Sequence, residues 1–379
     1  MSFPFLRPVR LAVICCLAAS GSGLAQSTPG RTLLALSKAD HTLAIVDPSN
    51  LEVLARIPVG SDPHEVIASA DGRTAFVSIY GGGSLHEIDI LDLEARKSKQ
   101  QFDTRPLLGP HGLDFADGKL WFTAEGSKAV ARFDPATGQV DWLMGTGQDR
   151  THMIYVAAGG KRIYTTNVAS GTVSILVDTP LQPRMGPPPG APQGPLPGSP
   201  AGTSPGAPAG KSSAGTLPQG NPPPGPRAHE DWQQTVIPVS RGSEGFDVSP
   251  DGRELWTAAA DDGTIAIIDL MSKKKLAIID AGCKGANRLK FTPDGQRVFV
   301  ASLSTGELSI FDAEKRQLVK RVKVGHGAAG ILMDKEGSRA FVACSADNYI
   351  AIVDLGTLKV TGRLSVGGVP DGMAWAIKP

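Results

Sequence analysis

Residues 249–282, SPDGRELWTAAADDGTIAIIDLMSKKKLAIIDAG, are echoed twice further along the chain. The second copy is TPDGQRVFVASLSTGELSIFDAEKRQLVKRVKVG at 292–325, and the third is DKEGSRAFVACSADNYIAIVDLGTLKVTGRLSVG at 334–367. Each copy holds three short runs rich in β-branched and other apolar residues, separated by turn residues, and a fourth run such as RLKF precedes the turn. Self-similarity at a fixed period indicates a repeat architecture, here with four short strands in each unit.

The same turn recurs along most of the chain. Its glycines are Gly72, Gly118, Gly160, Gly252, Gly295 and Gly337. The gaps between them are 46, 42, 92, 43 and 42 residues, so one gap contains a repeat plus about 50 additional residues. Those residues form the Pro-, Gly- and Ser-rich tract 180–229. We expect a disordered, polyproline-like insertion there, because the tract lacks the apolar residues of a core.

Four strands in a unit of about 42 residues predict a β-propeller. The innermost strands of the successive units are EVIASA, GLDFAD, MIYVAA, GFDVSP, RLKFTP, GILMDK and GMAWAI, which makes seven blades. The chain supplies three outer strands first and a single inner strand last, so the last strand should complete the N-terminal blade and close the ring. We therefore predict an all-β, seven-bladed β-propeller with four antiparallel strands per blade, formed as one domain by residues 26–379.

The pattern of the N-terminal residues predicts export. Arg7 and Arg10 precede the apolar run LAVICCLAA, and small residues precede Gln26, which together indicate a signal peptide over residues 1–25. We therefore expect a periplasmic or secreted protein. Without Arg7 and Arg10 the net charge falls from +1 to about −1, which argues against a nucleic-acid partner. The apolar run is too short for a permanent membrane span, and we expect a monomer.

Two cysteines, Cys283 and Cys344, remain after residue 25. The sequence contains no CxxCH motif, so we expect no haem c. A disulfide between the two cysteines is left open, because an oxidising compartment would allow it although they fall in different repeats.

The repeat places one residue per blade at the rim of the central channel. Each inner strand lines the channel, and the loop before it opens on one face, which we call the top. The rim position, seven or eight residues before each turn glycine, holds His64, His111, His152, Glu244, Asn287, Ala329 and, in the closing blade, Asp371. Glu125, His41 and His326 fall in other loops of the top face, whereas His86 and His229 do not.

Imidazoles and carboxylates that meet at one mouth favour a metal site or an acid–base site. Both groups are ligands of zinc-like ions, so we predict a divalent metal ion or another ligand at this mouth. The predicted ligand-binding residues are His64, His111, His152, Glu244 and Asp371. Catalysis would require a base that takes a proton and a cation that holds an oxyanion or enolate. The candidates for that chemistry are His111, His152 and Glu125.

The repeats resemble a known family. VFVASLSTGELSIFDAEKRQLVKRVKVG (298–325) and AFVACSADNYIAIVDLGTLKVTGRLSVGGVPDGMAWA (340–376) are similar to YVTN-type β-propeller repeats, which typify secreted propellers including the YncE-like periplasmic proteins. One blade, GPHGLDFADGKLWFTAEGSKAVARFDPATGQV (109–140), resembles the streptogramin-lyase and gluconolactonase-like propellers with their PHG…WFTE pattern. Here Ala124 is inserted before Glu125. The YVTN resemblance specifies the fold and leaves the function open.

Several functions are therefore compatible with the sequence. The first is binding of a small molecule, a metal ion or a protein partner at the top mouth. The alternative is a metal-dependent lactonase or lyase with His111 or His152 as the base and Glu125 and Glu244 beside the cation. A third function, binding of single-stranded nucleic acid, is disfavoured by the near-zero net charge, because neutralising phosphates needs clustered Lys and Arg residues. Repeat duplication could also multiply one ancestral histidine, whose ring would then only satisfy loop backbone groups.

Overall fold

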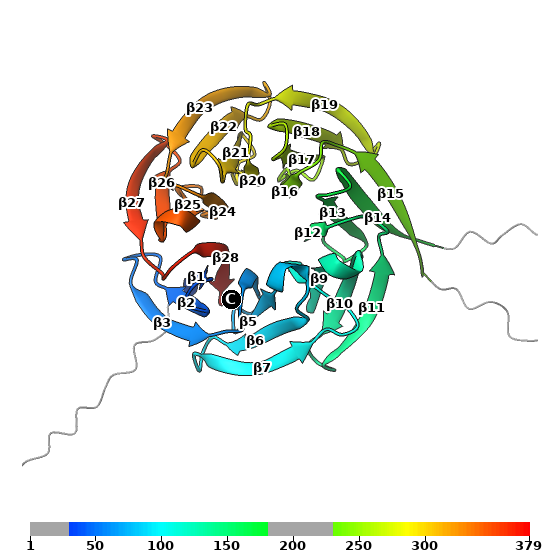
Figure 1. Ribbon diagram of the computed structural model, residues 1–379, viewed down its shortest axis with the longest axis vertical. Coiled ribbons are helices and arrows are strands. Elements are labelled where there is room, and N and C mark those ends of the chain that lie inside the picture. The colour runs from blue at the N-terminus through cyan, green and yellow to red at the C-terminus, as the bar shows by residue number, and fades with distance from the viewer. Residues whose placement is uncertain (1–29, 181–229) are drawn as a thin grey trace, which may run out of the picture.

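The fold is described from a computed structural model, which covers residues 30–180 and 230–379. Within these residues, seven four-stranded antiparallel sheets surround a central channel (Figure 1). The predicted seven-bladed β-propeller is therefore confirmed. The predicted signal peptide lies outside the described residues, and so does the predicted insertion except for Pro180.

Blade 1 is the blade that the last strand completes, and blades 2 to 7 follow it in chain order. Blade 1 contains β28 (Pro370–Ile377), β1 (Arg31–Ser37), β2 (Thr42–Val46) and β3 (Val53–Pro58). Blades 2 and 3 contain β4 (Pro63–Ala68), β5 (Thr74–Ile79), β6 (Glu87–Asp92), β7 (Lys97–Asp103), β8 (Pro110–Ala116), β9 (Lys119–Ala124), β10 (Ala129–Asp134) and β11 (Gln139–Gly145). Blades 4 and 5 contain β12 (Thr151–Val156), β13 (Arg162–Asn167), β14 (Thr172–Pro180), β15 (Glu230–Pro238), β16 (Ser243–Val248), β17 (Glu254–Ala259), β18 (Thr264–Asp269) and β19 (Lys274–Asp280). Blades 6 and 7 contain β20 (Ala286–Phe291), β21 (Arg297–Ser302), β22 (Glu307–Asp312), β23 (Gln317–Lys323), β24 (Ala328–Met333), β25 (Arg339–Cys344), β26 (Tyr349–Asp354) and β27 (Lys359–Leu364).

Single-turn 3-10 helices occur in three of the loops between second and third strands. They are η1 (Gly81–Gly83), η2 (Glu125–Ser127) and η3 (Ser345–Asp347). None of the described helices is long and apolar enough to cross a membrane.

The last strand closes the ring, as predicted. Strand β28 pairs antiparallel with β1, and Trp375 lies opposite Leu33. The Arg31 guanidinium lies 3.8 Å above the Trp375 ring and forms an ion pair with Asp334 of blade 7 at 2.5 Å. The two ends of the chain thus share one blade, and no sheet edge is left open at this point of the ring.

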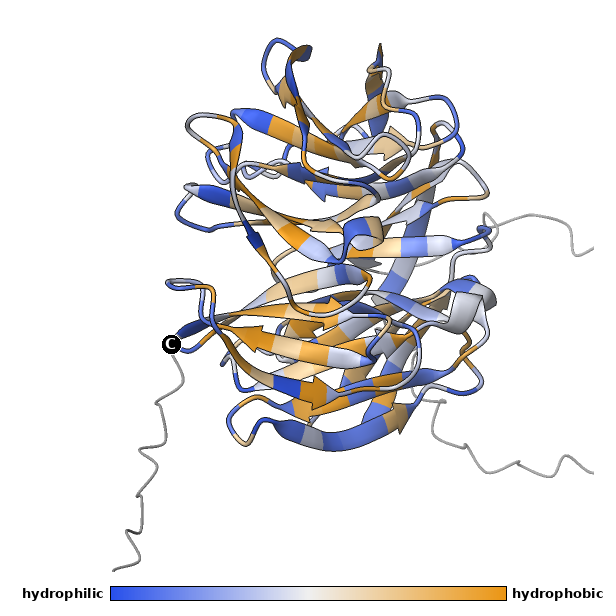
Figure 2. Cartoon of the chain, turned by 60° about the vertical axis from the view of Figure 1, so that its left-hand side comes forward, coloured by the Kyte–Doolittle hydropathy of each residue, from blue (hydrophilic) through white to orange (hydrophobic). Residues whose placement is uncertain are grey.

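The apolar core lies between the blades. The second and third strands of each blade are covered on both faces, because neighbouring blades stack against each other, and segments such as β26 are therefore almost continuously apolar. Figure 2 shows the strand centres as apolar and the connecting loops as polar. Trp121 and Trp256 occupy the same position in their second strands and are almost fully buried. The outermost strands differ, since β7 is polar and mostly exposed, which protects its free edge.

Two further features concern the insertion and the cysteines. Strands β14 and β15 pair as far as Pro180 opposite Glu230, so the tract between them joins the third and fourth strands of blade 4. Cys283 and Cys344 are both free and buried, so the disulfide that the sequence left open is not formed.

Candidate functional site

Each inner strand has a β-bulge at the predicted rim position. In blade 2, Pro63 pairs with Ile79 whereas Val66 pairs with Val77, so one additional residue is accommodated beside His64. The inner strands of the other six blades show the same shift of one residue. A bulge redirects side chains out of the regular alternation, and it commonly does so next to functional sites.

Hydroxyl groups from the second strands connect the bulges of neighbouring blades. Ser78 Oγ accepts the backbone N–H of Glu65 at 3.1 Å and donates to the His111 carbonyl of the next blade at 2.9 Å. Thr123 Oγ1 donates in the same way to the His152 carbonyl at 2.5 Å. These bonds fix the spacing between consecutive rim residues.

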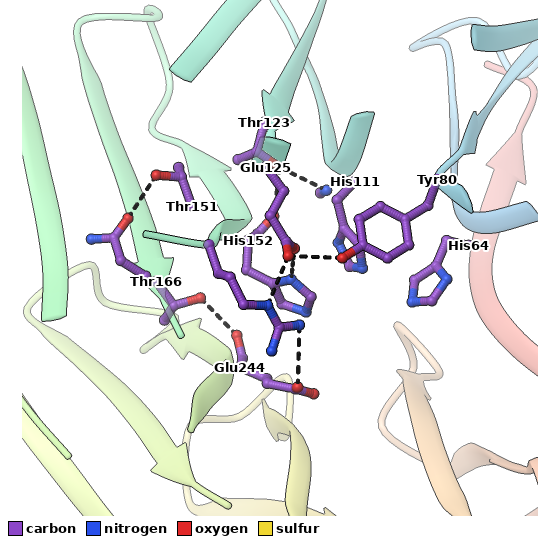
Figure 3. A network of polar contacts seen from close by, with 12 residues as sticks. His64, Tyr80, His111, Thr123, Glu125, Thr151, His152, Thr166 and Glu244 are labelled. Carbon is purple, nitrogen blue, oxygen red and sulfur yellow. Dashed lines mark hydrogen bonds and ion pairs between the residues drawn. The ribbon is translucent and has the colours of Figure 1, made fainter. Parts of the chain in front are cut away.

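Three histidines of blades 2, 3 and 4 form a stack at the mouth (Figure 3). The ring centroids of His64 and His111 are 4.4 Å apart, and those of His111 and His152 are 3.7 Å apart. Tyr80, which follows β5, lies edge-on to His111 at 4.8 Å. We call these three imidazoles the histidine stack. The structure thus brings together side chains that the sequence places in three separate repeats.

His111, in the middle of the stack, has no polar partner among the described residues. Its side chain is fully buried, and neither Nδ1 nor Nε2 forms a hydrogen bond. Burial, together with His152 and His64, holds the pKa of His111 well below its ordinary value, so the ring is neutral at physiological pH. A buried polar group without a partner costs roughly 1–3 kcal/mol. Such a group in a native protein points to a partner that belongs there.

Glu125, in η2, is the polar centre of the adjoining side of the mouth. Its carboxylate contacts His152 Nδ1 at 2.6 Å and accepts hydrogen bonds from Arg150 Nε and the Tyr80 hydroxyl, both at 2.7 Å. Burial by itself would raise the pKa of Glu125, but the bonds from His152, Arg150 and Tyr80 lower it to about 2. The ionised carboxylate therefore fixes the orientation of the His152 ring through Nδ1 and leaves Nε2 for another partner.

The opposite side of the mouth is organised by Lys38. Its Nζ lies 2.6 Å from His64 Nδ1, 3.0 Å from the Asp62 carboxylate and 3.7 Å from Asp371. Because an ammonium group only donates, His64 Nδ1 is the acceptor in this contact. Contacts with His64 and Lys38 hold the pKa of Asp62 well below its usual range despite partial burial.

An ion pair spans the channel one residue further along the inner strands. Arg288 of blade 6 donates to Glu65 of blade 2, and these blades are not neighbours in the ring. Both side chains are largely buried. Beside it, Asn287 donates to Glu244, and Glu244 lies 3.8 Å from Arg150. The cross-channel pair therefore links opposite sides of the channel.

All six predicted site residues lie in this network. His64, His111, His152 and Glu125 are in direct contact, while Glu244 and Asp371 join through Arg150 and Lys38. Three other top-face candidates lie outside it: Ala329 has no polar group, His41 is exposed, and His326 is exposed and bonded to Asp347.

Six residues of the mouth were not predicted from the sequence. They are Lys38, Asp62, Glu65, Tyr80, Arg150 and Arg288. A signal existed for Glu65 and Arg288, because they take the place where Gly112, Gly245 and two further repeats have glycine. At Gly245 an added Cβ would collide with the Asn287 carbonyl, so a larger residue at this position marks a local change of the strand. The other four lie in or beside loops that the repeat does not specify.

The chemistry of the mouth follows from these groups. Nitrogen and carboxylate atoms of His111, Glu125 and His152 lie within 4.8 Å of one another. The network offers neutral imidazoles, an imidazole oriented by a carboxylate, and one half-exposed guanidinium, Arg150. It can therefore coordinate or hydrogen-bond a ligand, and His152 Nε2 can accept a proton.

Comparisons with known proteins give the wider context. The family model of the cytochrome D1 heme domain matches residues 242–372, which covers blades 5 to 7 and the beginning of β28. No curated protein is significantly similar to the chain.

Solved structures share the fold at low sequence identity. The dihydro-heme d1 dehydrogenase NirN in complex with DHE is 15% identical, with a TM-score of 0.57 over 88% of this chain and 63% of that chain. The present chain thus spans less than two thirds of that protein. A protein from Bacteroides fragilis that carries the name 6-phosphogluconolactonase is 13% identical, with a TM-score of 0.65 over 92% of this chain and 99% of that one. A protein of unknown function from Desulfotomaculum acetoxidans is 12% identical, with a TM-score of 0.66 over 92% and 99%.

These comparisons correct the cofactor prediction. The sequence predicted a possible divalent metal ion and no haem c, whereas the comparisons point to haem-type binding, because the matching family model is that of a heme domain and the NirN structure is named for heme d1. The lack of a CxxCH motif excludes only the covalent attachment typical of haem c, and it does not bear on a haem held through a histidine alone.

Proposed function

We propose that this protein binds a small ligand in the top mouth of the propeller and that the ligand is a haem-type macrocycle. The observation that supports the proposal most is His111, a buried neutral imidazole with two unpartnered nitrogens at the centre of a polar network. Repeat duplication alone would explain three histidines, but it would not explain one whose ring nitrogens have no hydrogen-bond partner among the described residues.

The residues at the mouth fit a haem in their donor chemistry. Imidazole is a common axial ligand of haem iron, and both His111 and His152 have a nitrogen that no described residue engages. The Arg150 guanidinium is 43% exposed and could pair with an acidic substituent of the macrocycle. A bound haem would supply redox or electron-transfer chemistry. The histidines lie in blades 2 to 4, outside the matched residues 242–372, so the fit rests on this chain's own side chains.

A spectroscopic titration tests this proposal. Haemin is added to the purified protein, and we expect one equivalent to give a sharpened, shifted Soret band. The band should be lost in His111→Ala/His152→Ala and retained in the control His326→Ala, whose histidine lies on the same face but outside the network. Absence of a spectral change in the wild type, or an equal change in the double variant, would refute the proposal.

A second candidate is hydrolysis of a lactone, and one contact favours it. His152 is buried, is held through Nδ1 by the ionised Glu125, and has Nε2 free to act as a base towards water. Screening aliphatic and sugar lactones by pH-stat titration tests this activity. Glu125→Gln should lower turnover, because the amide no longer stabilises the imidazolium form of His152, whereas His326→Ala should not. Equal turnover in the two variants would exclude this role.

We also propose that the protein is exported and monomeric. Residues 1–25 support export to the periplasm or the medium, and the near-neutral charge supports a small-molecule rather than a nucleic-acid ligand. N-terminal sequencing of the protein from each cell fraction tests export, and sedimentation analysis tests the oligomeric state. An uncleaved N-terminus in the cytoplasmic fraction, or a dimer at micromolar concentration, would contradict the respective statement.

A further inference from the structure

A second cavity opens between blades 2 and 3 at the end of the propeller away from the mouth. Its volume is about 490 Å³, within the range of small-molecule sites. It lies among the turns that connect β4 to β5, β8 to β9 and β10 to β11, and β7 forms its outer side. Blades 2 and 3 are neighbours in the ring (Figure 1).

The walls of this cavity are aromatic and aliphatic. Phe76, Phe115, Phe133 and Ile90 come from four different strands and line it together. The rings of Phe76 and Phe115 are nearly parallel, at 18°, with their centroids 5.6 Å apart. Phe76 and Phe133 are almost fully buried, whereas Phe115 is partly exposed, so a ligand would meet the Phe115 ring. This wall favours a ligand with a flat apolar body that stacks on Phe115.

One charged side chain at the cavity is free to meet a ligand. Lys99 of β7 lines the cavity and forms no ion pair or hydrogen bond with any described residue. Asp71 also lines it, but its carboxylate already accepts bonds from Ser69 Oγ at 2.6 Å and from the Arg73 backbone N–H at 3.1 Å. The cavity therefore offers a ligand one ammonium group without an ion-pair partner among the described residues, beside the uncharged polar side chains of Ser69, Thr74 and Gln100.

The corresponding cavity between blades 5 and 6 is different in kind. It is larger, about 690 Å³, and charged residues of both signs line it. Arg316 is bonded there to Glu254 at 2.8 Å, and Trp256 takes the strand position that Phe76 has in blade 2. Its cations are already paired, and so the cavity of blades 2 and 3 is distinguished by its apolar walls and its unpaired lysine.

We propose that the cavity between blades 2 and 3 is a second ligand site, which takes an organic monoanion with a flat apolar body, such as an aryl carboxylate. The body lies against the Phe115 ring, and the carboxylate pairs with Lys99. The site is independent of the histidine stack and of any haem bound there.

Calorimetric titration with 2-naphthoate tests the site on the full-length protein. We expect one binding site at this cavity, weakened roughly tenfold in Lys99→Ala because a charge-assisted bond is lost. Lys97→Ala is the matched control, since Lys97 lies on the same strand and is exposed but does not line the cavity. In Ala136→Trp, a bulky ring introduced at an exposed lining position should abolish binding by occupying the space.

The sign of the ligand's charge provides an independent readout. Naphthylmethylammonium has a similar ring system and the opposite charge, so it should bind more weakly than naphthoate to the wild type, and Lys99→Ala should reduce the difference. The proposal is overturned if naphthoate does not bind, if Lys99→Ala and Lys97→Ala affect it equally, or if Ala136→Trp binds it unchanged while retaining the wild-type melting temperature.

Discussion

Blades 2 to 4 and blades 5 to 7 present different side chains at the same rim position. The first group contributes His64, His111 and His152, which are in ring contact, whereas the second contributes Glu244, Asn287 and Ala329. All of these residues occupy the same kind of bulge, so the backbone does not account for the difference. The repeat determines where a rim residue lies, and the choice of residue determines the chemistry. Blades 5 to 7, which match the family model of the cytochrome D1 heme domain, are therefore the blades without histidines at the mouth.

The largest effect on stability is expected for the ion pair that joins the two groups of blades across the channel. Arg288→Ala should lower the free energy of unfolding by about 3–5 kcal/mol, because Glu65 is left as a buried, unpaired carboxylate. Urea denaturation followed by tryptophan fluorescence measures the change. The double variant Arg288→Met/Glu65→Leu removes both charges and should be much closer to the wild type. If it were as unstable as Arg288→Ala, the loss would come from packing rather than from the unpaired charge.

Substitutions at equivalent rim positions in the two groups of blades should change the stability in opposite directions. Asn287→Leu should destabilise the protein by about 1 kcal/mol, because the bond to Glu244 is lost. His111→Phe should stabilise it by a similar amount, because an unpartnered buried imidazole is replaced by an apolar ring, and it should weaken ligand binding. Thermal denaturation of the two variants side by side checks this contrast. A destabilised His111→Phe would show that the imidazole already has a partner, such as a bound water.

The pH dependence of stability should reflect the protonation of the same imidazole, that of His111. The pKa of His111 is lowered in the folded protein by burial, so between that pKa and about 6.5 the unfolded chain binds more protons. Stability should therefore rise as the pH is raised towards 6.5, by at most about 1.4 kcal/mol per pH unit for one group, and level off above it. His111→Phe should show a shallower dependence in melting curves recorded from pH 5 to 8. Parallel curves for the two proteins would assign the dependence to other groups.

Glu125 should make a second acid-sensitive contribution to the stability of the fold. Its pKa is lowered to about 2, so its stabilisation is present above about pH 4.5 and is lost as the pH falls towards 2. Glu125→Gln should accordingly narrow the difference in stability between pH 5 and pH 3. An unchanged difference would place the acid sensitivity elsewhere in the network.

The smallest effect is expected for a histidine outside the network. The His326 side chain is 71% exposed and its imidazole pairs with Asp347, so His326→Ala should leave the melting temperature within the scatter of repeat measurements. A clear destabilisation would mean that the top loops of blades 6 and 7 are coupled to the fold more strongly than their exposure indicates.

The sequence was sufficient for the fold and for part of the site. Periodicity specifies strands, turns and rim positions, because these features recur in every repeat and each copy supports the others. It could not identify Tyr80, Arg150 or Lys38, since these lie in or beside loops whose conformation depends on contacts with other blades. Glu65 and Arg288 could have been suspected at positions where other repeats have glycine, but their pairing depends on distance across the ring, which no local pattern contains.

The cross-channel pair of Glu65 and Arg288 joins blades 2 and 6, which are not neighbours in the ring. The propeller therefore has a tie across its channel in addition to the closing strand β28. Because an ion pair acts on both of its partners, a displacement of blade 6 would be transmitted to blade 2, where His64 precedes Glu65 in the chain. The histidine stack is thereby coupled to blades that contribute no histidine to the mouth.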